Sequence, residues 1–191
     1  MMMTPSYFAD KFSAALSYER YVQTGTDEQN RRWQRVYDAA ALTGQQKNLV
    51  GGFVRQMNLL IISGIWCGDC VQQCPLIARI AEGNPGKISL RILDRDQHRD
   101  LTESFRVNAG DRVPIVLFLA EDFEFCAAYG ERTISRYRAF AHRYLGPACP
   151  TGIVGPDKDE LNATLADWLT EIERIQLMLR LSPRLRQMHG D

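Results

Sequence analysis

Two cysteines separated by two residues are the most informative chemical feature of the sequence. They lie in the segment Trp66-Cys67-Gly68-Asp69-Cys70, directly after a short apolar run and at the start of an expected helix. Two thiols at this spacing can close a small disulfide, and the first lies where the helix dipole and free backbone N–H groups favour a thiolate. A thiolate attacks disulfides, whereas a thiol does not. The pattern therefore predicts thiol–disulfide chemistry, with Cys70 shielded one turn inside the helix.

The elements that must position these thiols alternate between strands and helices. Apolar runs and period-two alternation predict strands at residues 58–63, 88–93, 113–119 and 123–129. Between and after the strands, helices are expected at about 70–81, 98–107 and 133–144. The order β-α-β-α-β-β-α indicates an α/β sheet with parallel and antiparallel parts.

Helical segments flank this alternating region on both sides. Residues 1–55 have helical character, and the stretch from Thr26 to Gln29 has the form of a capping box. A polar stretch at 43–47 separates this region from the first strand. After a loop rich in proline and glycine at 146–155, an amphipathic helix is expected at about 157–181. Its apolar face would dock on the domain, form a homodimer contact or bind a partner.

The composition is that of a globular protein with balanced charge. The chain has 191 residues, with 23 Lys plus Arg and 23 Asp plus Glu, which argues against a strongly basic nucleic-acid binder. Five cysteines are too few, and odd in number, for a disulfide-stapled scaffold. The longest apolar run falls far short of the roughly 20 residues that span a bilayer, and the N-terminus lacks the pattern of a signal peptide. We therefore expect a soluble, cytoplasmic chain with reduced thiols and no membrane or nucleic-acid partner.

Trp66-Cys67-Gly68-Asp69-Cys70 resembles the W-C-x-x-C motif of the thioredoxin superfamily, and two prolines and a glycine extend the resemblance. Pro75 stands where thioredoxins have a helix-kinking proline, Val113-Pro114 resembles their cis-proline segment, and Gly130 stands where the family often has a glycine before its last helix. The resemblance covers about residues 48–145. It implies a thioredoxin-like mixed sheet flanked by helices, with an N-terminal helical extension (1–47) and a C-terminal linker and amphipathic helix (146–191).

The same resemblance implies roles for the matching residues. Cys67 would be the nucleophile and Cys70 the resolving thiol. Pro114, if cis, would hold the backbone where a substrate strand can pair beside Cys67, and Trp66 would shield the dithiol or simply lie at its rim. The implied activity is that of a thiol–disulfide oxidoreductase that reduces protein disulfides and needs no organic cofactor. Its partners would be a disulfide-containing protein or a small thiol, with a thiol/disulfide reductase as electron donor.

Two departures from the family pattern bear on mechanism. Many thioredoxins bury an aspartate six residues before the first cysteine, where this chain has Ile61. Proton transfer would then use water or Asp69, or be slower. The dipeptide between the cysteines is Gly68-Asp69 rather than Gly-Pro, and a carboxylate this near would raise the thiol pKa, which favours a reductant over a strong oxidant. The alternative is that Asp69 points to solvent and has little effect.

A third cysteine leaves further alternatives open. Cys74 lies four residues after Cys70 on the same helix face, so it is a small buried apolar residue, a regulatory thiol or a metal ligand. Cys70 to Pro75 is similar to the C-x-x-x-C-P motif of thioredoxin-fold copper carriers, although none of the three histidines has a suggestive spacing. The alternative functions are therefore a redox-inactive binding or adaptor protein and a copper carrier that uses Cys70 and Cys74.

Overall fold

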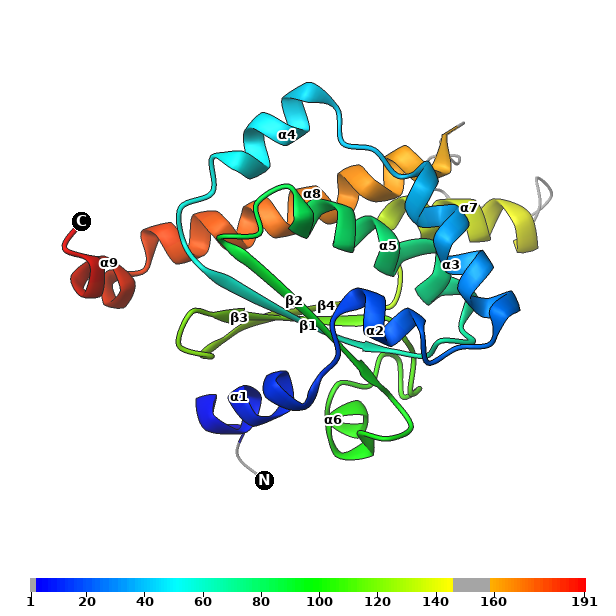
Figure 1. Ribbon diagram of the computed structural model, residues 1–191, viewed down its shortest axis with the longest axis horizontal. Helices are drawn as coiled ribbons and strands as arrows, with labels where there is room; N and C mark the ends of the chain where they lie inside the picture. The colour runs from blue at the N-terminus through cyan, green and yellow to red at the C-terminus, as the bar shows by residue number, and fades with distance from the viewer. Residues whose placement is uncertain (1–2, 146–158) are drawn as a thin grey trace.

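A four-stranded mixed sheet forms the centre of the protein in a computed structural model that describes residues 3–145 and 159–191. The strand order is β2-β1-β3-β4, with β1 parallel to β2 and β3 antiparallel to both of its neighbours. The strands are β1 (Met57–Ser63), β2 (Ile88–Asp94), β3 (Ile115–Ala120) and β4 (Phe125–Gly130). The expected α/β architecture with parallel and antiparallel parts is confirmed (Figure 1).

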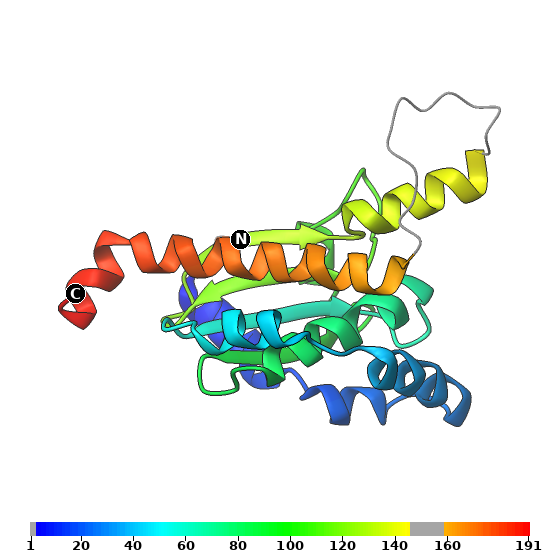
Figure 2. The same ribbon diagram turned by 90° about the horizontal axis from the view of Figure 1, so that it is seen from above.

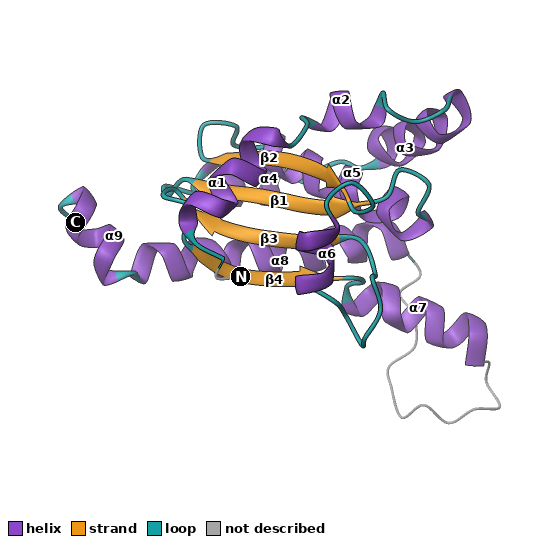
Figure 3. Ribbon diagram, turned by 90° about the horizontal axis from the view of Figure 1, so that it is seen from below, coloured by secondary structure: helices purple, strands orange, loops and turns teal. Residues whose placement is uncertain are grey.

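Helices cover both faces of this sheet, which explains why the central strands are almost continuously apolar. Every residue of β3 is buried, as are Leu59 to Ser63 of β1. One face carries α4 (Gly44–Gly51), α5 (Gly68–Glu82) and α8 (Glu160–Leu181). The other carries α1 (Pro5–Ala14) and α6 (Arg99–Ser104), which lie in front of the strands in Figure 3.

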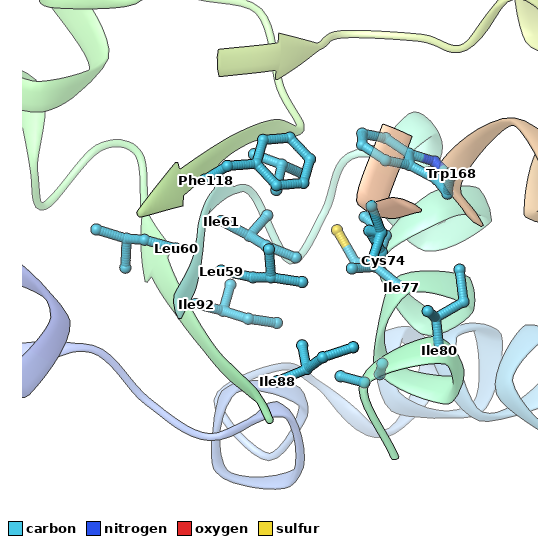
Figure 4. Packing of buried hydrophobic residues seen from close by; sticks show 14 of the residues in the cluster. Leu59, Leu60, Ile61, Cys74, Ile77, Ile80, Ile88, Ile92, Phe118 and Trp168 are labelled. Carbon is cyan, nitrogen blue, oxygen red and sulfur yellow. The ribbon is translucent and has the colours of Figure 1, made fainter. Parts of the chain in front are cut away.

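Side chains from α5 and α8 fill the space above the sheet. Cys74, Ile77 and Ile80 of α5 are fully buried. The sulfur of Cys74 points toward the sheet, and the fully buried Trp168 of α8 lies beside it (Figure 4). Figure 2 shows α8 running along the strands on the face that α5 also covers. The apolar face expected for the C-terminal helix is therefore buried against the domain.

The segment that links α1 to α2 pairs with the β2 edge of the sheet. The amide and carbonyl of Leu16 pair with those of Ile92 in β2, with N–O distances of 3.0 and 2.8 Å. The next two helices, α2 (Tyr18–Val22) and α3 (Asp27–Ala39), place Tyr21 and Trp33 in the same buried cluster as the sheet. The expected capping box at Thr26 begins α3.

Several element boundaries differ from those expected, and three of the differences have an identifiable cause. The polar stretch 43–47 is no separator, because Thr43 caps a helix with a capping box of its own and α4 begins at Gly44. The helix expected at 98–107 ends at Ser104, because Phe105 leaves the helical conformation with φ of −119° and ψ of 37°; Asn108 and Ala109 then adopt left-handed conformations with φ of 47° and 58°. The last strand begins at Phe125 rather than at residue 123, where φ of +64° closes the turn after β3.

The C-terminal part holds one element that the sequence pattern did not indicate. The expected helix at 133–144 is α7 (Ile134–Leu145), and the long amphipathic helix is α8. Ser182 then caps a further short helix, α9 (Pro183–His189). The loop expected at 146–155, with Cys149, lies outside the described residues. No helix in the described part of the chain is long and apolar enough to cross a membrane.

Candidate active site

The dithiol lies at the point where β1 leaves the sheet and α5 begins. Cys67 is the N-cap residue of α5, with extended backbone angles, and its carbonyl accepts the amide of Val71 at 3.0 Å. Cys70 lies within the first helical turn. Both cysteines are free thiols, and they differ in exposure: Cys67 is half-buried, whereas Cys70 has no exposed surface. This asymmetry makes Cys67 the accessible sulfur of the pair.

The strand-entry loop of β3 faces the accessible sulfur. The thiol of Cys67 donates to the carbonyl oxygen of Val113 at an S–O distance of 3.5 Å, and the Val113–Pro114 peptide bond is cis. The chain that precedes β3 therefore passes directly beside Cys67. Because proline has no backbone N–H, Pro114 offers no hydrogen-bond donor in the backbone beside Cys67.

A glycine at the end of β4 allows the segment around Pro114 to pack closely. Gly130 has φ of +150°, a conformation that side chains rarely permit. A Cβ atom at this position would lie 2.2 Å from the carbonyl oxygen of Pro114. The glycine that the family resemblance singled out is thus required by a backbone contact next to the dithiol.

Trp66 lies at the rim of the site rather than in the core. Its side chain is 47% exposed, and the guanidinium of Arg95 lies over its ring at 4.6 Å from the centroid. Gly64 lies under the same ring, since a Cβ there would approach the ring to 2.9 Å. Ile65, which precedes Trp66, is held by α3, because the indole N–H of Trp33 donates to the carbonyl of Ile65 at 2.9 Å.

Asp69 neither points to solvent nor lies free beside the thiols, which corrects both expectations for it. Its two carboxylate oxygens accept from Arg132 at 2.6 Å and from Arg136 at 2.8 Å, and its side chain is only 12% exposed. Arg136 also pairs with Glu160 at the start of α8. Two guanidinium groups therefore balance the charge that was expected to repel a thiolate, and both lie more than 60 residues away in the sequence.

The pKa values of both thiols are raised, although the helix start was expected to favour a thiolate. Hydrogen bonding to Cys70 and burial raise the pKa of Cys67, while the backbone N–H groups of Asp69 and Cys70 oppose this rise. Complete burial raises the pKa of Cys70 most strongly. The helix terminus thus acts in the expected direction, but the neighbouring thiol and the loss of solvent outweigh it.

Cys74 is a buried core residue within reach of Ser63. Its sulfur lies 3.8 Å from the hydroxyl oxygen of Ser63, and both side chains have no exposed surface. A disulfide needs Cβ atoms about 3.5–4.5 Å apart, whereas residues four apart on a helix hold theirs at about 5–6 Å. A Cys70–Cys74 disulfide would therefore require α5 to distort. Within residues 3–145 and 159–191, no three His, Cys, Asp or Glu side chains are grouped to hold a metal ion.

Sequence reasoning missed a buried polar residue that connects α5, the helix of the dithiol, to a distant segment of the chain. Gln73, fully buried in α5, donates to the carbonyl of Glu131 at 2.8 Å and accepts from the amide of Thr133 at 3.3 Å, which ties α5 to the segment before α7. The available signal was a glutamine amid the apolar residues of a helix expected to be buried.

Comparison with known proteins places the chain in a family. A family model described as Thioredoxin matches residues 15–140. No curated protein matches the sequence. A Pseudomonas aeruginosa protein of unknown function shares the fold, with a TM-score of 0.69 at 20% identity over 91% of this chain and 99% of that one. An HIV epitope scaffold does so with a TM-score of 0.67 at 19% identity, over 87% of this chain and 97% of that one. With the family model covering most of the chain, the protein belongs to the thioredoxin family.

Proposed function

We propose that the protein is a thiol–disulfide oxidoreductase that reduces protein disulfides. The observation that carries this proposal is the asymmetry of the dithiol: a half-buried, accessible Cys67 beside the cis Val113–Pro114 bond, and a fully buried Cys70 one turn into α5. An incoming disulfide can reach the first sulfur only. Cys67 is therefore assigned as the nucleophile and Cys70 as the resolving thiol.

The reaction has two exchange steps. The Cys67 thiolate attacks one sulfur of a substrate disulfide, a mixed disulfide forms, and the other substrate sulfur leaves and takes up a proton. Cys70 then attacks Cys67, the mixed disulfide breaks, and the second substrate sulfur leaves as a thiol. The products are a Cys67–Cys70 disulfide and a reduced substrate. A partner thiol/disulfide reductase or a small thiol would restore the dithiol.

The reducing direction is supported by the raised pKa of Cys67. Strong oxidants of this chemistry hold their reduced form as a stabilised thiolate, which makes the disulfide easy to reduce. Here burial and Cys70 raise the pKa of Cys67, so the reduced form lacks that stabilisation. Such a dithiol suits a reducing compartment such as the cytoplasm.

The test is to follow reduction of insulin, as a model protein disulfide, by the wild type and two serine variants. Cys67→Ser is expected to abolish reduction. Cys70→Ser is expected to accumulate a mixed disulfide through Cys67, detected by mass spectrometry. If Cys70→Ser captures no thiol partner, the assigned roles are wrong.

A redox titration of the wild-type protein distinguishes the proposed oxidoreductase from a redox-inactive adaptor. Wild-type protein equilibrated in graded glutathione buffers should form a reversible Cys67–Cys70 disulfide. If that pair never forms, a redox-inactive binding protein becomes the better reading. The copper-carrier alternative gains no support from the geometry, because Cys70 and Cys74 are both enclosed in the core.

A further inference from the structure

The first turn of α5 carries a carboxylate beside the nucleophile. Asp69 follows Cys67 by two residues, and its side chain is only 12% exposed. A poorly hydrated negative charge so close to a thiol opposes the formation of a thiolate. Arg132 donates to one oxygen of Asp69 at 2.6 Å, and Arg136 donates to the other at 2.8 Å. How much of this charge Cys67 meets therefore depends on two arginines from outside α5.

A buried glutamine fixes the backbone on both sides of Arg132. The side-chain amide of Gln73 donates to the carbonyl of Glu131 at 2.8 Å, and its oxygen accepts from the amide of Thr133 at 3.3 Å. The same side chain donates to the carbonyl of Asp69 at 3.3 Å. The placement of Arg132 opposite Asp69 is therefore built into the fold and does not depend on the ion pair alone.

An aromatic ring keeps the two guanidinium groups together in spite of their like charges. The ring centroid of Phe140, in α7, lies 4.3 Å from the guanidinium carbon of Arg132 and 5.0 Å from that of Arg136. Attraction between a cation and a ring is strongest where water is excluded, and the side chains of Arg132 and Arg136 are only 18% and 8% exposed. Phe140 and Asp69 thus hold both positive charges beside the first turn of α5.

Each of these arginines has a second carboxylate partner besides Asp69. Arg136 also pairs with the first residue of α8. Arg132 also donates to Glu131 at 3.3 Å, and Glu131 in turn accepts from Arg112 at 2.9 Å. This series begins one residue before the backbone carbonyl that accepts the thiol of the nucleophile. Three arginines and three carboxylates alternate along it: Arg112, Glu131, Arg132, Asp69, Arg136 and Glu160.

We propose that Arg132 and Arg136 are positioning residues for Cys67: by pairing with both oxygens of Asp69, they cancel the charge beside the nucleophile and hold the first turn of α5 in place. The inference rests on the proposed oxidoreductase function, in which Cys67 is the attacking sulfur. It explains how a carboxylate is tolerated between two reactive cysteines. It also extends the active site to α7 and, through Glu160, to α8 in the C-terminal extension.

The alternation of charges makes the sign of each substitution predictable. Arg132→Gln removes a positive charge, so Cys67 meets a net negative charge and its thiolate is disfavoured. Asp69→Asn removes the negative charge and keeps both arginines, so the thiolate is favoured. In the double variant the two changes cancel. A role in packing alone predicts something different, because both substitutions break the same ion pair and disturb α5 in the same direction.

The experiment measures the rate at which iodoacetamide alkylates Cys67 in the full-length protein, followed by mass spectrometry on the peptide that carries this residue. Loss of one neighbouring charge shifts a thiol pKa by about one unit, which changes the thiolate fraction about tenfold. The opposing change in nucleophilicity reduces the effect on the rate to about threefold. At pH 7 we therefore expect Arg132→Gln to slow alkylation about threefold, Asp69→Asn to accelerate it about threefold, and the double variant to react at the wild-type rate.

The pH dependence of this rate is a readout that a merely structural role does not move. Arg132→Gln should displace the pH–rate profile of Cys67 to higher pH, and Asp69→Asn should displace it to lower pH. Both substitutions leave in place the other charged and titratable groups on the elements around the site: Cys70 of α5, Arg95 after β2, Arg112 before β3, Glu131 before α7, Arg136 of α7 and Glu160 of α8.

Two further variants separate charge from general stability. Arg132→Lys keeps the positive charge and should restore the wild-type rate. Arg55→Gln is the matched control, because Arg55 is also a buried arginine in an ion pair, with Asp191, but it precedes β1 at the end remote from the dithiol. It should leave the alkylation of Cys67 unchanged. Arg132 is substituted rather than Arg136 because its side chain is the more exposed of the two.

The outcomes that overturn the inference differ from those that overturn the proposed function. An unchanged rate in Arg132→Gln, a shift in the same direction by Arg132→Gln and Asp69→Asn, a lysine variant as slow as the glutamine variant, or equal slowing by Arg55→Gln overturns the inference. None of these results bears on the function, since alkylation needs no substrate. A Cys70→Ser protein that captures no disulfide partner overturns the proposed function instead.

Discussion

At the scale of single residues, solvent access decides what each sulfur can do. Cys67 borders solvent and the carbonyl of Val113, so a substrate can reach it. Cys70 is enclosed by its own helix and by the end of β1, so it meets only what Cys67 brings to it. The sulfur that captures a substrate disulfide and the sulfur that resolves it are therefore only one turn of α5 apart.

The raised thiol pKa values predict that reduced protein loses stability as pH rises. Unfolded thiols ionise near the ordinary value of 9.0, whereas folded Cys67 and Cys70 keep their protons to higher pH. The folded state then binds more protons than the unfolded state, so the free energy of unfolding falls with pH, by up to about 1.4 kcal/mol per pH unit for each thiol. The contribution is fully present below pH 9 and is lost above it.

The oxidised form provides the internal control for this prediction. A Cys67–Cys70 disulfide has no proton to lose, and all other titrating groups are common to both forms. Urea unfolding of the two forms between pH 7 and pH 10 should show the oxidised form gaining relative stability as the pH rises. A gap that stays constant over this range would contradict the raised pKa values.

The dithiol itself is predictable from the sequence, because its chemistry depends on two residues three apart at a helix start. The state of Asp69 was not predictable. Its partners Arg132 and Arg136 follow β4, and only the fold brings them to the start of α5. The sequence shows that a carboxylate lies between the two cysteines. Its effect on Cys67 depends on the two arginines that pair with it, and no local sequence pattern links those arginines to Asp69.

At the scale of elements, two glycines near the dithiol differ in whether the fold could accept a side chain at their positions. Gly130 at the end of β4 has φ of +150°, and its missing Cβ makes room for the carbonyl of Pro114. Gly68 opens α5 with open space where a Cβ would lie. Only the first of these glycines is required by the fold.

Gly130→Ala is therefore expected to cost about 3 kcal/mol or more in the free energy of unfolding, because the backbone must move away from Pro114. Gly68→Ala is the matched substitution, and it should stabilise the protein by up to about 1 kcal/mol, since alanine is the better helix former. Thermal or urea unfolding measures both. Equal effects of the two substitutions would contradict the close contact at Pro114.

Strands were easier to predict than helix boundaries, for a physical reason visible in two places. Helices covering both faces of the sheet make β3 apolar throughout and β1 apolar from Leu59 to Ile62, and a continuous apolar run is a strong signal. The end of α6 is instead set at Phe105, which leaves the helical conformation with φ of −119° and ψ of 37°, and phenylalanine gives little local signal for the end of a helix. Residue propensities therefore cannot predict where this helix ends.

At the scale of the whole molecule, the N-terminal helices belong to the site as well as to the fold. Leu16 pairs with the backbone of Ile92 at the edge of the sheet, and Trp33 holds the carbonyl of Ile65 just before Trp66. The sequence predicted these helices from their own periodicity and caps. It could not show where they pack, because each contact joins residues tens of positions apart.

Two buried tryptophans test whether the link from α3 to the active-site loop matters for chemistry. Trp33 and Trp168 are both fully buried, but the indole N–H of Trp33 donates to Ile65, whereas that of Trp168 has no partner among the residues that the structure describes. Replacement by phenylalanine removes a similar volume at each site. Only Trp33→Phe also leaves a carbonyl of the loop without its donor, which adds about 1 kcal/mol to the cost.

Trp33→Phe should therefore lower stability more than Trp168→Phe and should also change the alkylation rate of Cys67 several-fold, because residues 64–66 lose their anchor. Trp168→Phe should change stability alone, since Trp168 packs in the core and donates no hydrogen bond to residues 64–66. Urea unfolding and iodoacetamide kinetics on the same samples measure the two effects. If both variants alter Cys67 equally, general loosening of the core controls the site, and the hydrogen bond to Ile65 has no special part in holding the nucleophile.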